Sequence, residues 1–454
     1  MQSADADEGM IGTIGGAQSS DVDESPGYSP LKAWCSVGIL LIFSLFSILD
    51  RQVIALLVEP IKADLQLSDT QLGLLQGLAF ALFYSLAGIP IGWAVDRFPR
   101  RIIIYLGITF WSLSTAACGL ATNFWQLFAG RTSVGIGEAT LTPVAVSLIS
   151  DRYPPNRVAT PFGVYSAGFY LGSGVALGIG GWVISLFAGQ THIVFPVIGS
   201  VASWQAVFLV IGLPGVLVAF LARLLHDPHP VRPRRAKAPE GDMGNLFTFF
   251  RIRRRVVTHA FAAFSLATFL SYAIGAWTPA FLSREFGVSP GRIGWTFGLV
   301  LAFSGAVGSF GGGLILDRIY RAGWKDAYFM VPGYAAIVAS FFLAGAYFMP
   351  SVTMVLVTLG IGMSIMSVTA PASYSTWRKI SVPEVRGQLS AAAVLCMGLF
   401  GAGFGPLAVA LVTNYVVGDE ARLGLSLSIV LGTAAPLMGL VFLTGRRSLS
   451  AIPD

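Results

Sequence analysis

Four charged residues stand inside long apolar stretches of this sequence, where charge is least expected. Asp50 and Arg51 are neighbours in the first such stretch, and Arg131 and Glu138 are seven residues apart in the fourth. A separation of seven places Arg131 and Glu138 on one face of a helix. Charges inside a membrane are costly and usually mark ion, proton or substrate pathways. The carboxylates could bind and release a proton as their surroundings change, and the arginines could attract an anionic head group.

The expected depths of these residues bring them together. The first stretch runs outward and the fourth runs inward, so Asp50 and Arg51 lie about 10–12 Å below the outer end of their helix, and Arg131 and Glu138 roughly 10 and 20 Å deep. Because side chains lean toward the start of their helix, Arg51 and Glu138 lean toward each other. We predict an Arg51–Glu138 ion pair and an Asp50–Arg131 neighbourhood. A structural interpretation stays open, in which the charges only hold the first helix against the fourth.

The composition assigns the bulk of the chain to a membrane. Of 454 residues, 54% are hydrophobic and 11% are charged, whereas soluble proteins have about 25% charged residues. Twelve apolar stretches are long enough to cross a bilayer, for which a helix needs about 20 residues. A water-soluble enzyme, a secreted scaffold and a disordered protein are therefore excluded.

The basic residues predict the orientation. We count 23 of the 29 Lys and Arg residues on the side that holds both termini, against four on the other side: Lys62, Arg284, Arg292 and Arg422. The positive-inside rule then places both termini in the cytoplasm of a multi-pass membrane protein. Because the net charge of +6 arises from residues that border the spans, it indicates membrane lipids rather than a nucleic acid as the partner.

The spans form two groups of six. We expect five segments: an acidic, disordered tail (1–30), an N-terminal six-helix bundle (31–225), a basic cytoplasmic linker (226–258), a C-terminal six-helix bundle (259–447) and a short tail (448–454).

A repeated motif relates the two halves. Gly92-x-x-x-Asp96-Arg97-x-x-Arg100 follows the second span, and Gly313-x-x-x-Asp317-Arg318-x-x-Arg321 follows the eighth, with the two aspartates 221 residues apart. This duplicated loop resembles the signature of the major facilitator superfamily. The resemblance implies an all-α integral membrane fold of 12 helices in two pseudo-symmetric bundles, which rock about a site near the membrane midplane.

A narrower resemblance lies in the charged spans. Leu49-Asp50-Arg51, together with Arg131-x-x-x-Gly135-x-Gly137-Glu138-Ala139, is similar to the Spinster family. The resemblance implies a transporter that moves a lysolipid, a sphingolipid-like molecule or another amphipathic anion by alternating access. The short loops between the spans indicate a bacterial member, in the inner membrane. Proton coupling at Asp50 and Glu138 is the corresponding expectation, with the proton as coupling ion and no cofactor.

The superfamily resemblance also implies a cavity and a gate. The cavity is expected to be lined by aromatic and Met side chains of the seventh and tenth spans: Phe269, Tyr272, Trp277, Met363, Met366, Tyr374 and Trp377. The cytoplasmic gate is expected to be formed by charged residues that follow the even spans: Asp96, Arg97, Arg100, Arg152, Arg157, Asp317 and Arg318.

Other functions are open at this point. A multidrug or organic-anion transporter of the same superfamily would suit a cavity rich in aromatic and Met side chains. A membrane-embedded lipid enzyme or receptor is disfavoured, because the sequence has no nucleophile–base pair, and its three cysteines and four histidines form no metal-ligand pattern. We expect a monomer that is not an enzyme and binds no metal.

Overall fold

The described part of the chain is almost entirely helical. The computed structural model describes residues 30–95, 97–153, 159–196, 199–225, 227, 246–382 and 385–452. Within these residues, two short antiparallel strands, β1 (His192–Phe195) and β2 (Gly199–Ala202), form a hairpin in which His192 is opposite Ala202. All other regular elements are helices.

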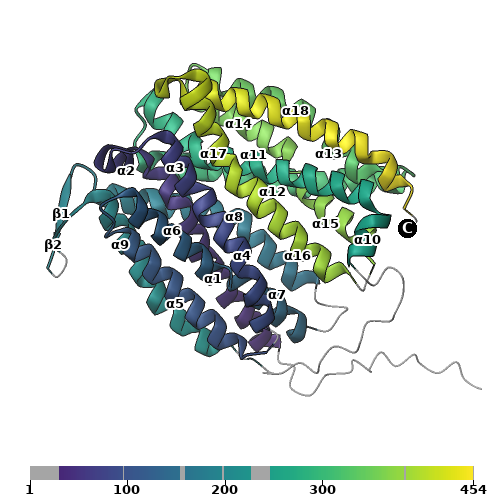
Figure 1. Ribbon diagram of the computed structural model, residues 1–454, viewed down its shortest axis with the longest axis horizontal. Helices are drawn as coiled ribbons and strands as arrows, with labels where there is room; N and C mark the ends of the chain where they lie inside the picture. Colours follow the sequence, from purple (N-terminus) through teal and green to yellow (C-terminus); the bar gives the residue numbers. More distant parts are fainter. Residues whose placement is uncertain are drawn as a thin grey trace, which may run out of the picture.

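The first half of the chain forms one bundle (Figure 1). Its helices are α1 (Pro30–Leu56), α2 (Val58–Leu65), α3 (Asp69–Gln76), α4 (Leu78–Val95), α5 (Arg100–Cys118), α6 (Phe124–Glu138), α7 (Leu141–Arg152), α8 (Ala159–Leu186), α9 (Ser203–Ala219) and the 3₁₀ turn η1 (Phe220–Leu224).

The second half forms the other bundle. Its elements are α10 (Leu246–Ile252), α11 (Arg254–Phe286), α12 (Pro290–Arg321), α13 (Ala327–Gly345), η2 (Ala346–Phe348), α14 (Val352–Met366), α15 (Thr369–Ile380), α16 (Arg386–Cys396), η3 (Met397–Gly403), α17 (Phe404–Leu411), η4 (Val412–Val417), η5 (Glu420–Arg422) and α18 (Leu423–Ser450). Of these, η3 and η4 are π-helical turns.

The helices account for the twelve expected membrane spans. Eleven described helical segments are long and apolar enough to cross a bilayer, and Leu171–Leu186 of α8 is a shorter apolar helix that provides the twelfth. Their backbone groups are bonded within each helix, which is what a lipid environment requires. The all-α membrane fold with two bundles is therefore confirmed.

Two spans are broken near their middles, at matching places in the two bundles. The fourth span divides into α6 and α7 directly after Glu138, and the tenth divides into α14 and α15 after Met366. A side-chain hydroxyl bonds a carbonyl at each break: Thr140 Oγ1 donates to Gly137 O at 2.8 Å, and Thr369 Oγ1 donates to Met366 O at 2.9 Å. Discontinuous helices of this kind surround the binding sites of membrane transporters.

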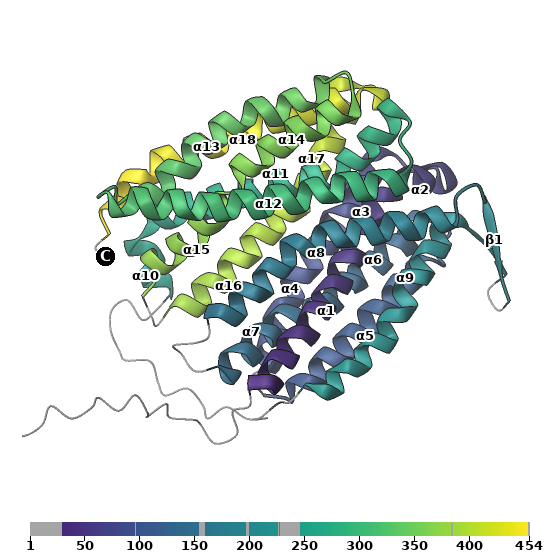
Figure 2. The same cartoon turned by 180° about the vertical axis from the view of Figure 1, so that it is seen from behind.

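The bundles meet along two seams. We call the side where α1 begins and α18 ends the terminus side, and the opposite side, with α2 and α3, the distal side (Figure 2). The turn η5 also lies at the distal side, because Glu420 pairs with Lys62 of α2. In one seam α8 packs on α12 so closely that a Cβ atom at Gly298 would lie 2.6 Å from the carbonyl oxygen of Gly174. In the other, Gly77 of the N-terminal bundle approaches the carbonyl oxygen of Gly403 equally tightly. Only glycine permits such contact between backbones.

Candidate functional site

Arg51 and Glu138 form the expected ion pair at the centre of the molecule. Arg51 Nη2 lies 2.6 Å from Glu138 Oε2, and Ser47 Oγ donates a hydrogen bond of 2.7 Å to the same oxygen. The Glu138 side chain is fully buried, whereas 19% of the Arg51 side chain is exposed. The pair therefore has one member sealed in the N-terminal bundle and one member that a bound molecule can reach.

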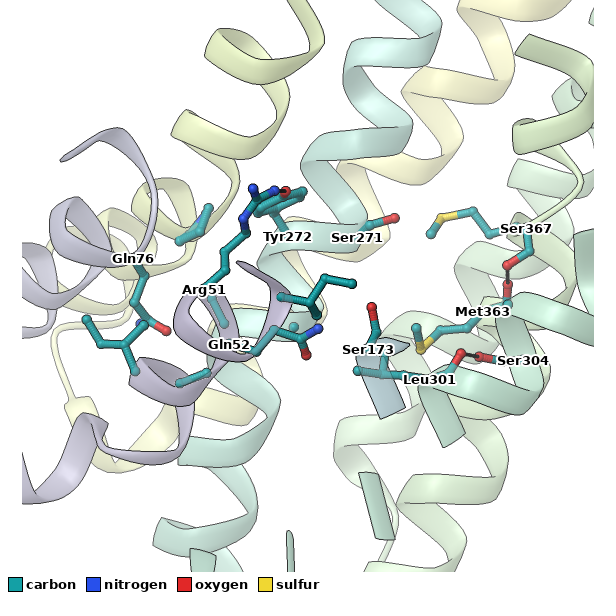
Figure 3. Close-up of a pocket in the computed structure, with 18 residues that line it drawn as sticks. Arg51, Gln52, Gln76, Ser173, Ser271, Tyr272, Leu301, Ser304, Met363 and Ser367 are labelled. Carbon is teal, nitrogen blue, oxygen red and sulfur yellow. Dashed lines mark hydrogen bonds between the residues drawn. The ribbon is translucent and has the colours of Figure 1, made fainter. Parts of the chain in front are cut away.

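The Arg51 guanidinium is held between the two bundles. Its Cζ atom lies 4.5 Å from the centre of the Phe80 ring and 5.3 Å from that of Tyr84, both on α4. Its Nη1 atom donates a hydrogen bond of 3.2 Å to the hydroxyl of Tyr272, on α11 of the opposite bundle (Figure 3). Aromatic faces stabilise a cation, so Arg51 stays charged and oriented toward the C-terminal bundle.

Asp50 and Arg131 are neighbours, as predicted, and the contact runs through the Asp50 backbone. Arg131 Nη1 donates a 3.0 Å hydrogen bond to the backbone oxygen of Asp50, and both side chains are buried. The Asp50 carboxyl group lies instead beside Trp111 and Thr115 of α5. Its Oδ1 atom has no hydrogen-bond partner within the described part of the chain. The third span thus contributes to the site, which the sequence analysis missed because a neutral Thr or Trp in an apolar helix gives no signal.

A central cavity of about 210 Å³ lies between the bundles. Arg51 and Gln52 of α1 line one side, and Tyr272, Met363 and Met366 of the C-terminal bundle line the other. Figure 3 shows the Arg51 guanidinium meeting Tyr272, while the Gln52 amide points toward the part of the cavity that Ser173 and Met363 line. The cavity therefore offers one cationic group and an opposing wall that is largely apolar.

Four of the expected cavity residues lie elsewhere. Trp277 is buried within its own bundle, and the half-buried Phe269 does not line the central cavity. Trp377 packs against Phe261 and Phe264, with ring centres 5.2 and 5.7 Å away. Tyr374 is 72% exposed on α15 and does not line the central cavity. Their helices present these side chains on faces other than the one that holds Tyr272 and Met363.

Trp277→Phe is therefore expected to change stability rather than transport. Trp277 Nε1 donates a 2.8 Å hydrogen bond to the carbonyl oxygen of Pro406, which fastens α11 to α17. Phe keeps most of the ring and loses this bond, which costs about 1 kcal/mol. We expect a lower melting temperature and an unchanged substrate affinity. A large loss of substrate affinity would instead show that Trp277 contacts the substrate.

Two of the expected gate residues, Arg97 and Arg100, bond within their own bundle. Arg97 donates to the backbone oxygen of Trp93 at 3.3 Å and stacks on that ring. Arg100 Nη2 pairs with Asp151 at 2.6 Å, while the Arg100 backbone N–H donates to Asp227 at 2.7 Å. These contacts join the start of α5 to the end of α7 and to the segment after α9.

The other gate residues lie at the same side. Arg152 is close to Asp227, and Asp317 and Arg318 are exposed near the end of α12. Asp96 and Arg157 lie outside the described residues. No ion pair between two described residues joins the bundles at the terminus side.

The distal side is closed by a cluster that the sequence analysis missed. Asp69 accepts bonds from Lys62 Nζ at 2.6 Å and from two Arg284 nitrogens at 2.7 and 2.8 Å. Glu59 accepts from Arg284 Nε at 2.7 Å, and Glu420 pairs with Lys62. We call these five residues the distal lock, since Glu59, Lys62 and Asp69 belong to one bundle and Arg284 and Glu420 to the other. Lys62 and Arg284 are two of the four basic residues that the sequence assigns to the side opposite the termini. Their scarcity on that side was the one sequence feature that could have indicated this cluster.

Comparison with known proteins gives one consistent result. The sequence profile described as Major Facilitator Superfamily matches residues 40–406. An "MFS-type efflux pump" of Mycolicibacterium smegmatis is 25% identical over 415 residues, which are 91% of this chain and 92% of that protein. The sphingosine-1-phosphate transporter SPNS2 of Xenopus tropicalis is 29% identical over 275 residues, 58% of this chain and 49% of that one.

A solved structure matches the whole fold. It is that of a bacterial homolog to the human lysosomal transporter Spinster, in an inward-facing and unoccupied conformation. The TM-score is 0.76 at 26% identity, covering 93% of this chain and 97% of that one.

Fold, site and comparisons define the class. Two helical bundles with a charged cavity between them form a multi-pass membrane transporter, and the similar proteins are transporters and not enzymes. The chain belongs to the Major Facilitator Superfamily, and its fold is similar to that of the bacterial Spinster homolog.

Proposed function

We propose that this chain is a proton-coupled secondary transporter of an amphipathic anion, most specifically a lysolipid or a sphingolipid-like phosphate. The observation that carries the proposal is the position of Arg51, whose charge reaches the cavity while its partner Glu138 is fully buried. An anionic head group in the cavity competes with Glu138 for Arg51. SPNS2, a relative, is a transporter of sphingosine-1-phosphate, which combines such a head group with one hydrocarbon chain.

Competition for Arg51 supplies a coupling mechanism. A buried carboxylate that loses its cationic partner is destabilised as an anion and favours the protonated form. Binding of the anion at Arg51 then promotes protonation of Glu138, and release of the anion restores the ion pair and expels the proton. Asp50, beside Arg131, provides a second carboxylate away from the cavity.

The membrane orientation is part of the proposal. The excess of Lys and Arg at the terminus side favours its placement in the cytoplasm of a bacterial inner membrane. With that orientation, the closed distal lock corresponds to an inward-facing state. A multidrug or organic-anion exporter is the second candidate, because the efflux pump of M. smegmatis is similar over nearly the whole chain.

Neutral substitutions of the two carboxylates test proton coupling. Glu138→Gln and Asp50→Asn are reconstituted in proteoliposomes with an imposed pH gradient, and uptake of a fluorescent lysophospholipid is measured. We expect pH-driven accumulation to be lost in at least one variant while exchange at equal pH persists, because exchange needs no net proton movement. Undiminished pH-driven uptake in both variants would refute proton coupling. Because Arg51 repels cations, the proposed anion transporter should not carry cationic dyes. Transport of such dyes instead of lysolipid would favour the multidrug candidate.

A further inference from the structure

A small cavity between the start of α5 and η1 is lined by two arginines, and nothing above assigns it a role. Its volume is about 210 Å³, and its lining residues are Arg101, Ile102, Tyr105, Ala222 and Arg223. We propose that this cavity binds the head group of an anionic phospholipid from the leaflet at the terminus side. The inference does not depend on the proposed function, because the cavity shares no lining residue with the central one.

The two arginines of this cavity have no acidic partner within the described part of the chain. The neighbouring Arg100 is buried, and it is bonded to Asp151 and Asp227. Arg101 and Arg223, in contrast, are exposed and form no ion pair with a described residue. Two like charges that line one small cavity repel each other, and an anion between them relieves the repulsion. A phosphate suits such a pair, because the planar guanidinium can bond two of its oxygens at once.

Aromatic rings hold the Arg223 guanidinium in place. Its Cζ atom lies 4.9 Å from the centre of the Phe220 ring and 5.9 Å from that of Tyr105. The two rings themselves meet edge to face, with centres 5.6 Å apart. A cation that is already stacked on aromatic rings loses less conformational freedom when it binds a ligand. Arg223 is therefore oriented before a lipid arrives.

The sequence repeat sets Arg101 apart from the other basic residues of its loop. The motif after the second span ends in Arg100-Arg101, whereas the corresponding motif after the eighth span ends in Arg321-Ala322. The first arginine is thus common to both halves and the second is not. The duplicated loop does not require a charge at this position, so the charge of Arg101 serves a role particular to the N-terminal bundle.

The surface beside the cavity favours a phospholipid over a soluble phosphate. Figure 2 shows α5 and α9 side by side at the edge of the N-terminal bundle, away from the C-terminal bundle. Both carry exposed apolar side chains at spacings of three and four residues, which place each set on one helix face. These are Ile102, Leu106, Phe110 and Leu113 on α5, and Leu213, Leu217, Phe220 and Leu224 on α9 and η1. Hydrocarbon chains that lie along these faces would end with their head group at the two arginines.

Photoaffinity labelling tests the site. The purified full chain is placed in nanodiscs of phosphatidylcholine with a trace of phosphatidylglycerol that carries a diazirine in one acyl chain, and labelled residues are mapped by mass spectrometry. We expect adducts on the exposed faces of α5 and α9. Their yield should exceed that of a phosphatidylcholine probe with the same chains about 30-fold, the effect of two arginines on a lipid of net negative charge.

Three double variants show whether the two arginines are responsible. Arg101→Gln/Arg223→Gln should reduce the yield to that of the phosphatidylcholine probe. Arg101→Lys/Arg223→Lys keeps both charges and should retain most of the yield, which separates loss of the site from a folding defect. Arg254→Gln/Arg255→Gln is the matched control, because it removes two exposed arginines at the terminus side that do not line this cavity. It should leave the yield unchanged.

Three outcomes would overturn the site. Equal yields for the two probes, or a yield that survives in Arg101→Gln/Arg223→Gln, would show that α5 and α9 contact only the general lipid belt. An equal loss in Arg254→Gln/Arg255→Gln would show a general attraction of the basic side for anionic lipids. Displacement of the probe by soluble glycerol phosphate would replace the lipid with a soluble phosphate. Each of these leaves the proposed function standing, because none of the variants alters Arg51 or Glu138.

Discussion

Arg51→Gln is expected to abolish transport of an anionic substrate and to destabilise the folded protein by about 3–5 kcal/mol. Both effects have one cause, since the Arg51 side chain is at once the cation of the cavity and the partner of a fully buried carboxylate. Removing one member of a buried pair leaves the other charge without compensation, which is far more costly than removing both. Gln also loses the contact with the Phe80 ring.

A second substitution separates the two effects. Adding Glu138→Gln to Arg51→Gln removes the orphaned charge, and we expect the double variant to regain most of the lost stability, because replacing both members of a buried pair is often nearly neutral. Transport should not recover, because the cavity still lacks its cation. The measurements are thermal unfolding of the purified protein and uptake by proteoliposomes.

Arg292→Gln is the matched control, because Arg292 is exposed on the distal side and lies outside both the charged site and the distal lock. It should change neither quantity. Recovery of transport in the double variant would show that the Arg51–Glu138 pair only holds α1 against α6. That outcome would support the structural interpretation of the four charges.

Helix geometry explains why half of the charged site could be predicted. Depth in the membrane follows from the distance along the helix, so Arg51 and Glu138 could be paired from their positions alone. Asp50 and Arg51 are adjacent, however, and successive residues on a helix point about 100° apart. They cannot both face α6, and Asp50 turns to Trp111 and Thr115 of α5. Whether Asp50 or Arg51 faces α6 depends on how α1 is rotated about its axis. That rotation is determined by packing against the neighbouring helices.

The cavity wall was harder to predict for another reason. In a soluble helix the polar face identifies the solvent side, but the membrane helices of this chain are apolar all round, so periodicity carries little information about the inward face. Tyr272 lines the cavity while Trp277, on the same helix, does not. The distal lock escaped prediction because its members come from separate segments, and nothing in the sequence pairs Asp69 with Arg284.

Asp69→Asn is expected to shift the protein toward a conformation with an open distal side. The Asp69 carboxylate is fully buried. It accepts hydrogen bonds from Lys62 of its own bundle and from both terminal nitrogens of Arg284 of the other bundle. Asn is nearly isosteric but neutral, so the closed state holds two cations with less compensation. In the open state these side chains are hydrated and the substitution costs little. The closed state should therefore lose about 3 kcal/mol relative to the open one, at the low end for a buried pair because Lys62 and Arg284 are partly exposed.

A change of about 3 kcal/mol alters the ratio of the two states about 100-fold. Spin labels at the exposed positions Ala63 and Ala421, one in each bundle, would report the distance across the distal side once the native cysteines are replaced by alanine. We expect a single short distance for the unmodified chain and a second, longer distance for Asp69→Asn. The transport rate should fall, because each cycle must return to the closed distal state.

Asp64→Asn provides the control, since it also removes an acidic group from the distal end of the N-terminal bundle. The Asp64 carboxylate accepts a 2.8 Å bond from Trp204 Nε1, and both residues belong to that same bundle. Its loss acts equally on the open and closed states, so the distance distribution should not change even if the melting temperature falls. If Asp69→Asn behaves like Asp64→Asn, the glycine contacts between α8 and α12 close the distal side without help from the ion pairs. In that case a Cβ atom at Gly298, 2.6 Å from the Gly174 carbonyl oxygen, should open the distal side instead.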